Sequence, residues 1–140
     1  MASRSICSKD TTYRYVLRLL AVDTAIAFEE HLQKCDKCAE RAYQLTDFLR
    51  LIRKSLRNRE SIDSSTRATM EAFLHSSAES VKPRDEEKLI QALANCFSGY
   101  ERLYRNLLRK VENADADKIK QIAVEIMLAL PAHLHNPKKG

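Results

Sequence analysis

Apolar residues recur at helical spacing along most of the chain, which predicts a series of amphipathic helices. The first is expected over residues 11–21 with Asp10 as its N-cap, because apolar side chains there fall at positions i, i+3, i+4 and i+7. A short helix should follow, and then a long one that runs to about Arg57 with Asp36 as its N-cap. The apolar residues that carry these predictions are Tyr13, Val16, Leu17 and Leu20, then Ile26, Phe28 and Leu32, then Leu45, Phe48, Leu49, Ile52 and Leu56.

A fourth, weaker helix is predicted over residues 65–78, after a polar loop at residues 58–64. Met70 and Phe73 share one side of it. Because the loop is polar and the helix is short, we expect this helix to be loosely tethered. Its apolar side would then be free to lie on a partner protein, as amphipathic helices do in grooves.

The second half of the chain has a simpler pattern. Apolar residues recur at spacings of three and four over residues 84–111 and again over 116–130, and the short connection predicts an antiparallel helical hairpin. Residues 76–83 are expected to be a linker, since they end in proline. We therefore predict two domains, over residues 1–80 and 81–140, and the second should end in a polar, mobile tail from Pro131 to Gly140.

The composition supports an all-α fold. The 140 residues include only two glycines and three prolines. Gly-rich phosphate loops and dinucleotide-binding turns need glycine, and no pairing of a nucleophile with a general base stands out. The sequence therefore predicts an all-α protein that is not an enzyme.

The compartment in which the protein is expected determines how its cysteines are interpreted. No stretch of the sequence is apolar enough for a membrane helix and the first residues do not resemble a secretory signal, so a cytoplasmic protein without membrane association is expected. In that compartment, four cysteines with a tight Cys-x2-Cys pair favour metal or redox chemistry over disulfides.

The most informative motif is His31-x3-Cys35-x2-Cys38, three residues of the types that bind zinc. Around tetrahedral zinc, neighbouring ligand atoms lie only about 3.5–3.8 Å apart. On one continuous helix, His31 and Cys38 would be separated by a rise of about 10 Å. The chain should therefore bend between His31 and Cys35, so that one helix ends at the histidine and the next begins at the thiol pair.

A closed structural zinc site needs a fourth ligand, and Cys7 is the best candidate because it precedes the first helix and could fold back. Cys96 falls in the apolar row of a long helix, where a buried thiol packs as a small hydrophobe. His75, His133 and His135 are expected to be ordinary exposed histidines.

The segment Phe28-Glu-Glu-His31-Leu-x-x-Cys35-x-x-Cys38, with an amphipathic helix and a cysteine upstream, resembles the zinc-binding anti-sigma factor domain. The resemblance covers residues 7–57, and extends to 75 if the following helix is the family's fourth. It implies that Cys7, His31, Cys35 and Cys38 hold zinc. It also implies a protein that binds an alternative sigma factor and keeps it from RNA polymerase.

This chain departs from the family in one turn. Family members often have glycine between their first two helices, whereas this sequence has Ala21-Val22-Asp23-Thr24 there.

The distribution of basic residues also bears on the kind of partner that the protein binds. The net charge is +5, and residues 1–58 hold 11 basic and 7 acidic side chains. Arg50, Arg53, Lys54 and Arg57 form a stripe along one face of the long helix. The stripe is either a solvated face or a surface that steers an acidic patch of the sigma factor toward the protein. With Met70 and Phe73, these residues are the predicted partner-binding set.

Other hypotheses about the function of these residues stay open. The zinc could be redox-labile, since oxidation of its thiolates would release it. A DNA-binding regulator could place the basic stripe on phosphates, although the charge is modest and no paired aromatics accompany it. A thiol oxidoreductase would leave His31 unexplained. A helical adaptor with structural zinc and a different partner fits the residues equally well.

Overall fold

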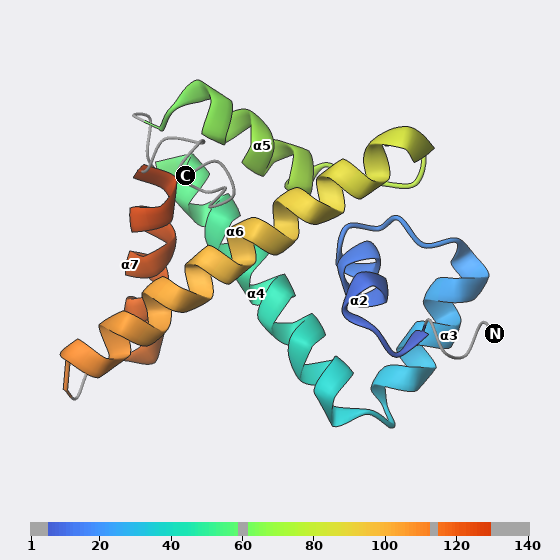
Figure 1. The fold of residues 1–140 in the computed structure, drawn as a ribbon, viewed down its shortest axis with the longest axis horizontal. Helices are drawn as coiled ribbons and strands as arrows, with labels where there is room; N and C mark the ends of the chain where they lie inside the picture. Colours follow the sequence, from blue (N-terminus) through green and yellow to red (C-terminus); the bar gives the residue numbers. More distant parts are fainter. Residues whose placement is uncertain (1–5, 59–61, 113–114, 130–140) are drawn as a thin grey trace.

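The computed structural model describes residues 6–58, 62–112 and 115–129, and these ranges contain helices but no strand (Figure 1). The all-α prediction is therefore confirmed. The expected tail after Pro131 and the histidines His133 and His135 lie outside the described residues. The helices are α2 (Lys9–Val16), α3 (Val22–Leu32), α4 (Asp36–Asn58), α5 (Ser64–Leu74), α6 (Pro83–Lys110) and α7 (Ala116–Ala129).

The ends of α2 differ from the prediction. Ser8, not Asp10, is the N-cap, and its hydroxyl accepts a hydrogen bond of 3.1 Å from the Thr11 amide. The helix also ends well before residue 21. Arg18 takes a left-handed backbone conformation, with φ of 63°, and the amides of Arg18 and Leu19 bond back to carbonyls of the last turn. This arrangement is a Schellman motif, which stops a helix.

Helix α4 is the long central element, and α6 crosses it (Figure 1). Phe48, in the middle of α4, is fully buried, and its ring lies 5.3 Å from the ring of Phe97 and 4.8 Å from that of Tyr100, centroid to centroid. Aromatic pairs at such distances add to the stabilisation from buried area alone. The centre of the core is therefore the crossing of α4 and α6.

Helix α5 is not a loosely tethered element. Met70 and Phe73 have 0% and 2% of their surface exposed, and both belong to the hydrophobic core, where α5 packs on α4 and α6. Just after α5, the buried hydroxyl of Ser76 donates a hydrogen bond of 2.8 Å to the Leu17 carbonyl. In this structure Met70 and Phe73 are core residues, and they are not exposed to a partner. The apolar side that suggested a docking helix is used within the chain.

The predicted domains 1–80 and 81–140 share one core. Helix α7 turns back against α6 and also contacts α4, where the Gln121 amide donates a hydrogen bond of 2.7 Å to the Ser55 hydroxyl. On the other side, Arg14 of α2 forms an ion pair of 2.7 Å with Glu86 of α6. The cluster of buried side chains joins both halves of the described chain, among them Leu17, Leu45, Phe48, Ile52, Phe73, Leu93, Phe97, Val124 and Leu128.

None of the helices in the described ranges is long and apolar enough to cross a membrane.

Candidate metal centre

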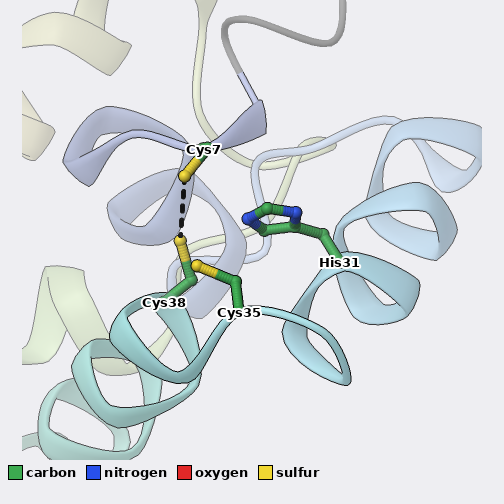
Figure 2. A group of neighbouring side chains, drawn as sticks. All are labelled: Cys7, His31, Cys35 and Cys38. Carbon is green, nitrogen blue, oxygen red and sulfur yellow. Dashed lines mark hydrogen bonds between the residues drawn. The ribbon is translucent and has the colours of Figure 1, made fainter.

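The four predicted metal ligands lie together at the junction of three helices (Figure 2). Cys7 stands just before α2, His31 is in the last turn of α3, Cys35 lies between α3 and α4, and Cys38 is in the first turn of α4. Residues from well-separated parts of the chain thus converge on one point.

The predicted bend between His31 and Cys35 is confirmed. Helix α3 ends at Leu32, and the amides of Lys34 and Cys35 donate hydrogen bonds of 2.9 and 3.0 Å to the His31 carbonyl. These bonds satisfy a carbonyl at the end of α3 and turn the chain into α4. The expectation that Asp36 is the N-cap of the long helix is wrong by one position, because Asp36 is the first residue of α4.

The spacing of the donor atoms suits one small ion. One ligand atom from each of the four residues lies within 4.8 Å of the other three, and the Sγ atoms of Cys7 and Cys38 are 3.8 Å apart. Sulfurs bound to one tetrahedral zinc at about 2.3 Å would be separated by about 3.8 Å. The four side chains could therefore hold a metal ion with only a small contraction of the wider pairs.

The histidine ring supports this interpretation independently. His31 Nε2 is buried and has no hydrogen-bond partner, and one nitrogen of the ring faces the cysteine sulfurs in Figure 2. A buried polar atom without a partner is unfavourable unless something else satisfies it. A metal ion among the sulfurs would accept the lone pair of this nitrogen.

The surroundings fix the position of the histidine. The fully buried ring of Phe28 lies 6.2 Å from the His31 ring and 5.0 Å from the ring of Tyr15, centroid to centroid. The Tyr15 hydroxyl donates a hydrogen bond of 2.8 Å to Glu29 and so links α2 to α3. The sequence pattern did not identify Tyr15 as part of this support, because its role depends on how α2 and α3 pack.

The thiols of Cys35 and Cys38 differ in acidity. A hydrogen bond from the Cys38 amide, with a second from the Cys38 thiol, lowers the pKa of Cys35. Burial raises the pKa of Cys38 to about 11, and its contacts with Cys35 and Cys7 act in the same direction. Of these two thiols Cys35 ionises first, and an incoming cation must displace a firmly held proton from Cys38.

Three sulfurs and one imidazole nitrogen form a complete tetrahedral donor set for zinc, although softer thiophilic ions fit the same donors. Four protein ligands leave no open coordination position, and an open position is what catalytic zinc sites keep. An ion held by all four residues would join the helices and would have no free coordination position for water.

The remaining thiol and histidine of the described chain lie elsewhere. Cys96 is buried in α6, and burial raises its pKa to about 11, as expected for a thiol that packs as a hydrophobe. His75 is exposed at the end of α5, as predicted. Neither belongs to the metal cluster.

The basic stripe is exposed as a whole. Arg50, Arg53, Lys54 and Arg57 all face solvent on α4, and Arg50 forms an ion pair of 2.7 Å with Asp47 one turn earlier. Exposure is compatible with both a solvated face and a steering surface, so the stripe's role stays a prediction.

Thiol labelling should reveal the cluster. In reduced protein treated with a chelator, we expect iodoacetamide to modify Cys7 and Cys35 before Cys38 and Cys96, because the first two are more exposed and the pKa of Cys35 is lowered. Added zinc should slow labelling of Cys7 and Cys35 but not of Cys96, which can be followed by peptide mass spectrometry. Equal rates with and without zinc would contradict a metal site here.

Comparisons of the chain with known protein families, with curated proteins and with solved structures find no match.

Proposed function

We propose that this protein is a zinc-binding anti-sigma factor, which sequesters an alternative sigma factor from RNA polymerase in the cytoplasm and so regulates transcription. The observation that carries the proposal is the cluster of Cys7, His31, Cys35 and Cys38 at the α2–α3–α4 junction. It combines the donor set and the helix placement that the resemblance to the anti-sigma domain implies. Zinc would act as a structural ion in this protein.

In this proposal the ion keeps α2, α3 and α4 in one arrangement. Few apolar side chains of α3 are buried, and Phe28 is the one with no exposed surface. Binding to a structural zinc site can supply about 10–16 kcal/mol in small peptides, far more than one buried side chain. The position of α3 would therefore depend on the ion.

The partner surface would combine charge with an apolar contact. The basic stripe would steer an acidic surface of the sigma factor and affect the association rate more than the affinity. Since Met70 and Phe73 are buried, the apolar contact must come from other residues. Val22 and Ile26, one turn apart on α3, have 74% and 49% of their surface exposed and would supply it.

Co-purification tests the proposal. The tagged, zinc-loaded full chain is expressed in the cells that encode it, and the bound proteins are identified by mass spectrometry. A sigma factor should be recovered in stoichiometric amount. The variant Arg53→Glu, Lys54→Glu, Arg57→Glu should then bind the purified sigma factor about tenfold more slowly at low salt, because electrostatic steering is lost.

A matched control reverses three exposed charges elsewhere, on α6: Arg102→Glu, Arg109→Glu and Lys110→Glu. This variant should associate at the rate of the original protein. If co-purification with the folded, zinc-loaded chain reproducibly recovers another protein and no sigma factor, the anti-sigma proposal is wrong. The hypothesis of a helical adaptor with a different partner then takes its place.

A further inference from the structure

A hollow of about 310 Å³ lies where the end of α2 meets α4 and α5. Three arginines line it: Arg18 follows α2, and Arg50 and Arg53 are on α4. Its apolar lining includes Leu49 of α4 and Leu74 of α5. The hollow is separate from the metal cluster, with which it shares no residue.

The charge of this hollow is unbalanced. No acidic side chain lines it. Within the described part of the chain Arg50 pairs with Asp47, whereas Arg18 and Arg53 form no ion pair. Guanidinium groups beside apolar surface attract an anion more strongly than they would in open water, and their planar donors match a carboxylate.

The backbone of Arg18 is a second, independent observation. The residue has φ of 63° at the C′ position of a Schellman motif, which is the position where helices most often carry glycine. A side chain there strains the backbone, so the fold by itself favours glycine. An arginine at this position places its guanidinium in the lining of the hollow. Residues in unfavourable backbone conformations are typically found at functional sites, where the side chain is needed.

We infer that this hollow binds a small amphipathic carboxylate. The carboxylate would pair with Arg18 and Arg53, and a short hydrocarbon group would lie against Leu49 and Leu74. The volume is at the lower end of that of small-molecule sites, which matches a single short chain and not a large cofactor. Because Leu74 belongs to α5, a bound carboxylate would also hold α5 against α4. The inference does not depend on the anti-sigma proposal.

Calorimetric titration of the metal-loaded full chain with octanoate tests the inference. We expect saturable binding, weakened about tenfold in Arg53→Gln and about tenfold in Arg18→Gly, because each loses one charged hydrogen-bonding partner. The melting temperature of Arg18→Gly without ligand should be at least that of the original protein, since glycine relieves the strain. Loss of binding in a variant that is no less stable separates a binding role from a structural one.

The control variant is Arg57→Gln, which removes a charge of the same stripe outside the hollow. It should bind octanoate unchanged. Acetate, which lacks the hydrocarbon, and octanol, which lacks the charge, should each bind at least about tenfold more weakly. Absence of saturable octanoate binding, equal weakening in Arg57→Gln, or inorganic phosphate binding as tightly as octanoate would each overturn the inference.

Discussion

Replacement of Cys38 by serine is expected to abolish stoichiometric metal binding and to loosen the junction of α2, α3 and α4. The Cys38 thiol is buried in the first turn of α4 and lies 3.8 Å from the Cys7 sulfur. A hydroxyl is a poor ligand for thiophilic ions and does not ionise near neutral pH. Elemental analysis should therefore fall from about one ion per chain to none, since four ligands fill one tetrahedral site.

The loss of the ion should also appear in stability. A ligand bound at a concentration well above its dissociation constant stabilises a fold by several kcal/mol, so the melting temperature of Cys38→Ser should drop by about 10 °C or more. A chelator should lower the melting temperature of the original protein by a similar amount and leave that of the variant unchanged.

Cys96→Ser is the matched control. Cys96 is also buried and its pKa is also about 11, but it lies outside the cluster. This variant should keep its metal, although a buried hydroxyl will reduce its stability somewhat. A Cys38→Ser protein that retained a full equivalent of tightly bound ion would show that the cluster is not the metal site.

Metal uptake should weaken as the pH falls. Thiols bind as thiolates, and the pKa of Cys38 is about 11 in the metal-free protein. At neutral pH the ion must therefore displace its proton, and each further fall in pH makes that displacement less favourable. This direction follows for any cation that the cluster binds.

Phe48→Ala is expected to destabilise the whole described chain in one step, by about 3–5 kcal/mol. The side chain is fully buried between α4 and α6 and contacts the rings of Phe97 and Tyr100. Its removal leaves a cavity at the centre of the shared core, which the surrounding helices can fill only in part. Denaturant unfolding followed by circular dichroism and by tyrosine fluorescence should give the change in free energy.

The same experiment decides between one folding unit and two. If residues 1–80 and 81–140 were independent domains, each signal would show two transitions, because both halves contain helices and tyrosines. We expect coincident transitions that shift together, because Phe48 belongs to one half and Phe97 to the other. Tyr43→Ala, on the same helix but 65% exposed, should change the free energy of unfolding by less than about 0.5 kcal/mol.

Most helices were predictable because their apolar spacing is regular. The cluster was predictable for a different reason, since zinc chemistry limits both the residue types and the distances. His31 and Cys35 could only meet if the chain turned between them, and the hydrogen bonds to the His31 carbonyl make that turn. The position of Cys7 followed from the need for a fourth donor.

The features that apolar periodicity could not settle depend on tertiary packing. An apolar side on a short helix looks the same whether it will meet a partner or its own chain, so the burial of Met70 and Phe73 could not be read from periodicity. A linker that ends in proline likewise does not reveal whether the segments it joins share a core. The left-handed conformation of Arg18 was missed because arginine rarely adopts it.

The order of the ligands along the chain has a consequence for biosynthesis. The last of the four ligands is Cys38 and α6 begins at Pro83, so all four donors are synthesised before α6. The ring of Phe48 can be covered by the ring of Phe97 only after Phe97 has been synthesised. Ion binding by the nascent chain could therefore precede formation of the core, because the 31 positions between Cys7 and Cys38 are fewer than the 49 between Phe48 and Phe97. If the cluster holds an ion in the cell, a shortage of that ion would then act on the protein during its synthesis, before folding is complete.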